Sequence, residues 1–292
     1  MGYDYDMLTK DCNLLSKRYD FCDLYSVGES VMEKKLYCLK VGNGEKKLFI
    51  NCAHHGLEYL TAEFIVKFLE CFCQAFSNKE LFFGYDMLRL YNAVTLYAVP
   101  MVNPDGVDIA VNGIDITNAY HRKLISMVGI HSFNKVWQAN ANGVDINHNY
   151  NAGWRAVKAY PSPTGYAGPY SESEPETKAM VDLIMTEKFD MLIAFHSQGR
   201  EIYYDFDGSV PDRSYEIVQK MEDVSGYTPA TPTGTAAYGG CKDWFIKKFS
   251  KSGFTVEIGS GTNPLPDEML DKIFDENAKI ILSAMEELAQ SQ

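Results

Sequence analysis

KLFINCAHHGLE, residues 47–58, joins a short apolar run to a group of polar side chains. A Gly-Asn-Gly turn signal at 42–44 precedes the apolar run, so we expect a buried strand over 47–53. The following residues, 58–76, carry apolar side chains at helical spacing and predict an amphipathic helix. The alternating segment 35–40 predicts another strand, and its short connection to the first favours a hairpin. A buried strand that leads directly into a helix is typical of an α/β fold.

Strands and helices continue to alternate along the rest of the chain. Further strands are predicted at 93–102, 189–197 and 254–259, and further helices at 5–18, 174–188, 211–224, 240–249 and 266–289. This order favours an α/β fold with a mainly parallel sheet and helices on both faces, in a single domain comprising residues 1–292. The segment 151–170 is rich in Pro, Gly and Tyr and has no periodicity, so we expect a functional surface loop.

The composition disfavours several classes of partner and location. A net charge of −12 and a pI of about 5.0 oppose binding to phosphate backbones and anionic lipid, so no nucleic-acid partner is expected. No apolar stretch approaches the roughly 20 residues of a transmembrane segment. The N-terminal sequence MGYDYDMLTKDCNLL lacks the features of a signal peptide. The seven cysteines show no repeated spacing, which indicates reduced thiols and a cytoplasmic location, with one or two disulfides or a redox sensor as the alternatives.

Three side chains at the ends of predicted strands form a candidate metal site. His55 and Glu58 follow the first strand and are three residues apart, and His196 follows the strand over 189–195. The carboxyl ends of parallel strands lie at one edge of the sheet, where functional sites occur. Imidazole and carboxylate are good zinc ligands, and three protein ligands leave a fourth position for water. This pattern predicts a catalytic metal site.

His54 is the nearest competitor for ligation. Strand alternation points its side chain to the opposite side from His55, so we expect it to support the site or to pack in the core. The alternative interpretation of the whole group is that Glu58 caps a helix and that the histidines are hydrogen-bonded core residues.

Glu257 lies within the apolar run FTVEI, residues 254–258. Alternation along this strand directs Glu257 to one face and its apolar neighbours to the other. A carboxylate in such a run is costly to bury without a partner. We therefore expect Glu257 to be the general base that takes a proton from water at the metal, with a structural ion pair or an edge-strand position as the alternative.

Five motifs together resemble those of the zinc metallocarboxypeptidases, the carboxypeptidase A-like family. They are HGLE (55–58), MVNPDG (101–106), GVDINHNY (143–150), FHSQG (195–199) and TVEIG (255–259). Their order matches the family, and with the flanking helices the resemblance covers nearly the whole chain. It implies a mixed, mostly parallel eight-stranded sheet with helices on both faces. It also implies a peptidase in which His55, Glu58 and His196 hold one Zn²⁺ ion and Glu257 is the catalytic base.

The chain departs from this family at positions that contact substrate. The family motif GVDxNRN carries an arginine that binds the terminal carboxylate of the substrate, and His148 occupies that position, so a bidentate guanidinium is lost. A second family arginine polarises the scissile carbonyl, and Gln138, after Trp137, takes its place. A neutral amide can still stabilise an oxyanion. The tyrosine that the family places four residues before a Gly-Gly pair aligns with Thr235, and Tyr238 lies nearby.

These departures resemble one branch of the family, the bacterial γ-D-glutamyl-meso-diaminopimelate peptidases of the cell wall. The branch is further indicated by SQGREIYYDF (197–206), GCKDWF (240–245) and EIGSGTNPLP (257–266). The resemblance implies a peptide or muropeptide substrate, cut between the γ-carboxyl group of D-Glu and diaminopimelate. Glu257 and Gln138 are then the catalytic candidates, and the residues expected to bind substrate are Asn147, His148, Gln198 and Arg200.

Two other functions are compatible with the same residues. A carboxypeptidase acting on L-peptides is disfavoured because an imidazole binds a terminal carboxylate poorly near neutral pH. A pseudoenzyme that binds wall peptides is disfavoured because the complete ligand set and its base are present.

Overall fold

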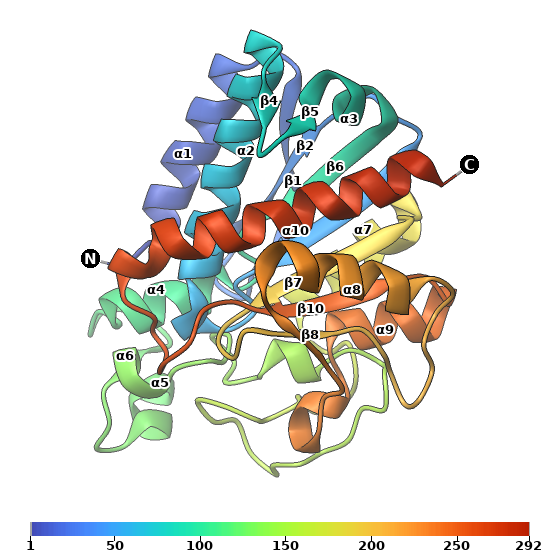
Figure 1. Ribbon diagram of the computed structural model, residues 1–292. Helices are drawn as coiled ribbons and strands as arrows, with labels where there is room; N and C mark the ends of the chain where they lie inside the picture. The colour runs from blue at the N-terminus through green and yellow to red at the C-terminus, as the bar shows by residue number, and fades with distance from the viewer. Residues whose placement is uncertain (1, 292) are drawn as a thin grey trace.

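A mixed sheet of eight strands forms the centre of the fold, which the computed structural model in Figure 1 describes for residues 2–291. In chain order its strands are β1 (Cys22–Glu29), β2 (Lys35–Val41), β3 (Lys46–Cys52), β6 (Val94–Val99), β7 (Met191–His196), β8 (Glu201–Tyr203), β9 (Thr228–Ala230) and β10 (Gly253–Glu257). Their order in space is β1-β2-β6-β3-β7-β10-β8-β9, with β6, β3, β7 and β10 mutually parallel. A separate small sheet pairs β4 (Leu81–Phe82) with β5 (Tyr85–Asp86). The predicted mixed, mostly parallel eight-stranded sheet is confirmed.

Helices cover both faces of the sheet. One face packs against α1 (Tyr5–Arg18), α2 (Leu60–Asn78), α3 (Met87–Ala93), α8 (Ser214–Ser225) and α10 (Leu270–Gln290). The other packs against α7 (Pro175–Glu187) and α9 (Cys241–Phe249). A third apolar cluster, around Trp137, holds α4 (Pro104–Asn112), α5 (His121–Val128) and α6 (Phe133–Val136). Figure 1 shows α10 crossing the sheet on the same side as α1 and α2.

The burial of β3 explains why helices are needed on both faces of the sheet. Its last five residues are all buried, because successive side chains enter opposite layers. Leu48 and Ile50 join the core beneath α2 and α10, whereas Phe49 joins the core beneath α7 and stacks on Phe189 with ring centroids 4.7 Å apart. A strand that is apolar on both faces is stable only inside a sheet that is covered on both sides.

The predicted hairpin between the strands near residues 35–40 and 47–53 is wrong. β2 and β3 are not paired, because β6 lies between them. Tyr97 of β6 is opposite Lys40 in the antiparallel pair with β2 and opposite Phe49 in the parallel pair with β3. Every residue of β6 is buried, so this strand gains most from an interior position with a partner on each edge. Local connection length favoured the hairpin, and burial of β6 overrode it.

Three strands of the eight-stranded sheet, and both strands of the small one, were not predicted from the sequence. β1 is mostly half-exposed and lies at one edge of the sheet, so its apolar pattern is weak. β8 and β9 have three residues each, too few for a clear periodicity. β8 nevertheless matters for function, because it pairs with β10 and places Glu201 opposite Glu257.

The register of the central strands brings two predicted site residues together. Glu257, the last residue of β10, is the direct partner of His196, the last residue of β7. β3 pairs with β7 on its other edge and ends beside Phe195. All three strands are parallel, so their carboxyl ends lie at one edge of the sheet. The loops that leave this edge form the candidate site, and the single domain over residues 1–292 stays a prediction.

Truncation of Phe64 should test the packing between α2 and the sheet. Phe64 is fully buried and makes an edge-on ring contact with Phe195 of β7 at a centroid distance of 5.1 Å. We expect Phe64→Ala to lower the free energy of unfolding by about 3–5 kcal/mol, because it leaves a cavity in a close-packed core. Urea unfolding measures the change. Leu14→Ala on α1, where the side chain is 49% exposed, should change it by less than about 0.5 kcal/mol. Equal effects of the two substitutions would contradict the core described above.

Candidate metal centre and active site

The loop that carries two of the predicted ligands follows β3 directly and contains the short 3-10 helix η1 (Gly56–Glu58). Close packing against α4 fixes its path. A Cβ atom at Gly56 would lie 2.4 Å from the carbonyl oxygen of Gly106, so only glycine fits there. The side-chain amide of Asn103 donates to the carbonyl oxygen of His54 at 2.9 Å. The backbone is therefore held in place before any ligand binds.

His55, Glu58 and His196 converge on one point. Nδ1 of His55 lies 2.8 Å from Oε1 of Glu58, and Nδ1 of His196 lies 3.0 Å from Oε2 of the same carboxylate. One donor atom from each residue lies within 4.8 Å of the other two. Two imidazole nitrogens and a carboxylate are a donor set that suits zinc, and three protein ligands leave room for water and substrate. The residues present therefore fit a catalytic zinc ion.

The electrostatics keep Glu58 ionised. Its burial alone would raise the pKa, but the charge of His55 and the hydrogen bonds from His196 and His55 lower the pKa to about 2. The backbone N–H of Ser197 also donates to Oε2 at 3.2 Å. An ionised carboxylate is the form that binds a cation, so no proton has to be removed from Glu58 when the ion enters.

Asp145 contacts two of the histidines at the site. Its Oδ1 lies 3.1 Å from Nε2 of His55 and 3.1 Å from Nδ1 of His148. Burial opposes the charge of Asp145, but His148 and His55 hold the pKa of this carboxyl well below its usual range. A carboxylate on the second ring nitrogen fixes the orientation of a ligating histidine. Asp145 thus orients His55 and His148 together.

Glu257 reaches the same cavity from β10. Burial raises the pKa of Glu257 to about 8, the nearby charges of Glu58 and Glu201 act in the same direction, and His55 opposes them. A carboxyl group whose pKa lies near neutrality is well matched to proton transfer. Geometry and environment both fit a general base.

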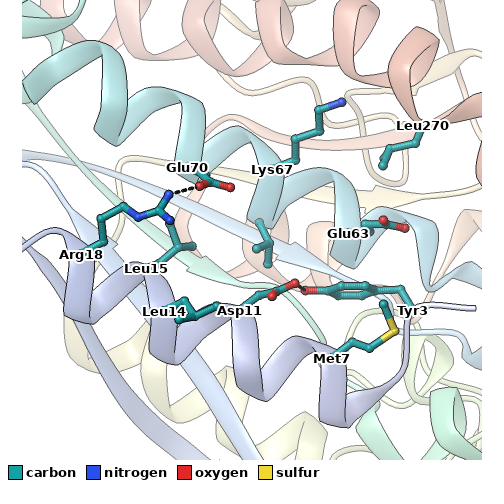
Figure 2. Close-up of a pocket in the computed structure, with 11 residues that line it drawn as sticks. Tyr3, Met7, Asp11, Leu14, Leu15, Arg18, Glu63, Lys67, Glu70 and Leu270 are labelled. Carbon is teal, nitrogen blue, oxygen red and sulfur yellow. Dashed lines mark hydrogen bonds and ion pairs between the residues drawn. The ribbon is translucent and has the colours of Figure 1, made fainter. Parts of the chain in front are cut away.

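A small cavity of about 110 Å³ lies over these residues, and His55, His196 and Glu257 line it. A larger cavity of about 280 Å³ lies between α1 and α2, where Figure 2 shows its side chains. In that cavity Arg18 pairs with Glu70, and the hydroxyl of Tyr3 donates to Asp11 at 3.0 Å. None of the predicted site residues lines the larger cavity, so its size alone does not make it the functional site.

Two of the predicted substrate-binding residues line the small cavity. Oδ1 of Asn147 accepts a hydrogen bond from the backbone of Cys241 at 3.2 Å, and among the described residues none accepts from its amide nitrogen. His148 lies between Asp145 and the carbonyl oxygen of Thr235, which is 2.9 Å from Nε2. These contacts hold both side chains at the wall of the cavity.

The other three predicted residues do not line this cavity. Gln138 lies beside the ligand loop, where its Oε1 accepts a hydrogen bond from the backbone of Leu57 at 3.3 Å. Gln198 is exposed, and its Oε1 accepts one from Gly261 at 3.1 Å. The guanidinium of Arg200 is paired with Glu276 of α10 at 2.6 Å. The structure therefore does not bring Arg200 to the metal ligands.

Lys242 also lies at this site, although the sequence pattern did not predict it there. This lysine is 3% exposed and lines the cavity beside Glu257, and Asp243 follows it. The signal that could have found it is a charged pair, Lys-Asp, directly before the apolar run 244–246 of the helix 240–249. Tyr238 also lines the cavity and makes an edge-on ring contact with His148 at a centroid distance of 6.0 Å.

Three convergent ligands and an adjacent half-buried carboxylate at the ends of parallel strands define a mononuclear metallohydrolase. A sequence profile described as zinc carboxypeptidase matches residues 9–280. The chain belongs to this family and is a zinc metallopeptidase.

Individual relatives agree with this assignment. The γ-D-glutamyl-L-diamino acid endopeptidase 1 of Lysinibacillus sphaericus is 38% identical over 288 residues, which are 97% of this chain and 72% of that protein. A crystal structure of thrombin-activatable fibrinolysis inhibitor superimposes with a TM-score of 0.78 at 20% identity, covering 100% of this chain and 75% of the other. The murein-tripeptide amidase MpaA of Escherichia coli O157 superimposes with a TM-score of 0.58 at 19% identity, covering 92% of each chain. The two structural likenesses show the fold.

Proposed function

We propose that the chain hydrolyses the amide bond between the γ-carboxyl group of D-Glu and meso-diaminopimelate in bacterial cell-wall peptides. The observation that carries the proposal is the set of cations at the cavity wall. Among the described residues, those that line the cavity include His148 and Lys242 but no arginine. A site without a guanidinium fork is poorly suited to the terminal carboxylate of an ordinary L-peptide.

The similarity to a named enzyme supports the same substrate class. The relative from Lysinibacillus sphaericus is by its name a γ-D-glutamyl-L-diamino acid endopeptidase, and the alignment covers nearly all of this chain. A γ-D-glutamyl bond differs from an ordinary peptide bond because the acyl group is reached through the side chain of glutamate. The substrate also bears several carboxylates and amines, so a different arrangement of cations around the metal is expected.

The proposed chemistry follows from the positions of the side chains. A bound zinc ion supplies a Lewis acid that activates water and polarises the scissile carbonyl. Glu257 accepts the proton from the attacking water and then delivers it to the nitrogen of the leaving amine. Asp145 holds His55 in the orientation that ligation requires. Gln138 is our candidate donor to the developing oxyanion, since its side chain is already anchored to the ligand loop through Leu57.

Substrate binding is assigned to Asn147 and His148, which line the cavity. The pKa of His148 is raised: burial opposes the charge, but the adjacent Asp145 carboxylate more than offsets it, so the imidazolium form is favoured. This form carries a positive charge that attracts a carboxylate, while its two N–H groups face Asp145 and the carbonyl oxygen of Thr235. Gln198 is kept as a candidate at the exposed rim. Arg200 is no longer assigned to substrate, because its guanidinium is bound to Glu276.

The location is proposed to be a reducing compartment such as the cytoplasm. All seven cysteines are free thiols, and six of them are buried. Within residues 2–291, no helix is both long and apolar enough to cross a bilayer.

Digestion of defined peptides tests the proposed function. The zinc-loaded protein is incubated with L-Ala-γ-D-Glu-meso-diaminopimelate, with muropeptides and with a blocked L-dipeptide, and mass spectrometry follows the products with and without a chelator. We expect release of meso-diaminopimelate that the chelator abolishes. Faster cleavage of the L-dipeptide would favour an ordinary carboxypeptidase and overturn the proposal.

A further inference from the structure

Three isoleucines on the segment around α5 are exposed to solvent. Ile116 is 80% exposed, Ile125 is 45% exposed and Ile130 is 98% exposed. Every other isoleucine that the structure describes is buried, except the half-buried Ile114. A single exposed apolar side chain is common, but a group of them on one short segment marks a surface that binds a partner.

The segment is firmly attached to the rest of the fold. Leu124 and Val128 of α5 are four residues apart, so they lie on one face of the helix, and both are buried in the apolar cluster around Trp137. Arg122 and Ile125 lie outside this face and are exposed. Figure 1 shows α5 and α6 at an outer edge of the molecule. The isoleucines are therefore exposed on an ordered segment whose buried positions are filled by other side chains.

The same segment has a charge opposite to that of the whole chain. Residues 113–136 contain Arg122, Lys123 and Lys135 and a single acid, whereas the net charge of the chain is −12. All three cations are exposed. Lys123 donates to Oδ1 of Asn142 at 3.1 Å, and among the residues that the structure describes no carboxylate forms an ion pair with any of the three. The cations are therefore free to attract an anionic partner.

An anionic lipid surface fits this combination better than a protein surface does. Apolar side chains interspersed with Lys and Arg are typical of segments that lie in the head-group region of a bilayer. Protein interfaces, by contrast, are depleted in lysine. The acidic remainder of the chain disfavours anionic lipid, but at physiological salt its repulsion is screened beyond roughly 8 Å. A basic segment at the edge of the molecule can therefore bind while the acidic faces stay in solvent.

We propose that residues 113–136 bind the surface of an anionic lipid bilayer. The three exposed isoleucines enter the boundary between head groups and acyl chains, and the three cations contact the lipid phosphates. The metal site lies close to this surface, because the segment leads directly into Trp137, whose carbonyl oxygen would lie 2.7 Å from a Cβ atom at Gly56 of the ligand loop. The inference does not depend on which peptide the enzyme cuts.

Co-sedimentation with lipid vesicles tests this inference. The protein is mixed with vesicles of phosphatidylcholine alone, or of phosphatidylcholine with the anionic phosphatidylglycerol, at low and at high salt. Ile116→Ser/Ile130→Ser removes the two most exposed apolar side chains of the segment, and Arg122→Gln/Lys135→Gln removes two of its cations. The matched controls replace exposed side chains on other elements, as Leu14→Ser/Leu81→Ser and Lys10→Gln/Lys17→Gln.

We expect the wild type to bind the anionic vesicles at least about 10-fold more tightly than the zwitterionic ones, with a difference that falls as salt is added. Each variant of the segment should lose about 10-fold or more in affinity for the anionic vesicles, whereas the two controls should bind like the wild type. The urea midpoint of every variant should stay unchanged, because only exposed side chains are replaced.

Three results would overturn the inference. The first is a wild type that binds neither kind of vesicle or binds both equally, and the second is a loss of binding in the controls as large as in the variants of the segment. The third is concentration-dependent dimerisation in analytical ultracentrifugation that Ile116→Ser/Ile130→Ser abolishes, since a second copy of the chain would then cover this surface.

Discussion

Glu257→Gln is expected to lower kcat of the zinc-loaded enzyme by about 10³–10⁴-fold, because a positioned general acid–base contributes about 10²–10⁴-fold and this one acts twice. Glutamine keeps the size of the side chain and removes its ability to accept a proton. Glu257 is not one of the three ligands, so the zinc content should stay at one ion per chain. Release of meso-diaminopimelate from the tripeptide, followed by mass spectrometry, measures the rate, and elemental analysis measures the zinc.

Glu201→Gln provides the matched control for this experiment. Glu201 is the register partner of Glu257 on β8, and its Oε2 accepts a hydrogen bond from Tyr203 at 2.8 Å. It has a similar position in the sheet without a role in proton transfer. We expect its rate to change by less than about 5-fold, within the range of substitutions that only adjust a neighbouring charge. Turnover by Glu257→Gln at a rate close to that of this control would remove Glu257 from the mechanism.

The central strands could be predicted from the sequence because each carries its own signal. β3, β6, β7 and β10 are runs of buried apolar residues, and this pattern depends on the strand alone. The order of strands depends on which edges find partners, which no single segment encodes. That is why β2 and β3 were expected to form a hairpin although β6 separates them. The strands β8 and β9, with three residues each, had no detectable periodicity.

The residues of the candidate site were likewise predictable only in part. His55, Glu58, His196 and Glu257 could be placed together because all follow or end strands, and parallel strands end at one edge. Side chains beyond the strand ends were less predictable, because their directions depend on local partners. Arg200 was expected near the substrate, yet an acid on the C-terminal helix binds it. Lys242 was overlooked because a lysine near a helix end ordinarily indicates an exposed position.

The second large effect is expected from His55→Gln, which should lose the zinc ion and with it all measurable hydrolysis. A protein zinc site typically has a binding free energy of about 10–16 kcal/mol over four ligands, so each ligand contributes roughly 3 kcal/mol, or on the order of 10²–10³ in affinity. The second ring nitrogen of His55 contacts Asp145, so the substitution removes a zinc ligand and also the contact that orients it. Competition with a chromophoric chelator measures the zinc affinity.

His54→Gln is the control that makes this test specific, because His54 is the adjacent residue and is also a buried histidine. Its Nε2 lies 3.0 Å from the hydroxyl of Tyr150, and its ring stacks on His196 with centroids 5.4 Å apart. Burial holds the pKa of His54 well below its ordinary value, so it is neutral and makes no ion pair. We expect this variant to retain one zinc ion per chain, with an affinity within about 10–100-fold of the wild type, as for other supporting residues.

The two variants together show which of the two adjacent histidines is the zinc ligand. If His55 ligates and His54 supports, the two glutamine variants differ in zinc content, and activity follows the metal. Equal zinc content in both variants would mean that the ring of His54 can rotate into the ligand position. The contacts of His54 oppose such a rotation, because Asn103 holds its carbonyl oxygen and Tyr150 holds its ring. Loss of zinc from His54→Gln alone would exchange the two roles and would require a different path for the loop after β3.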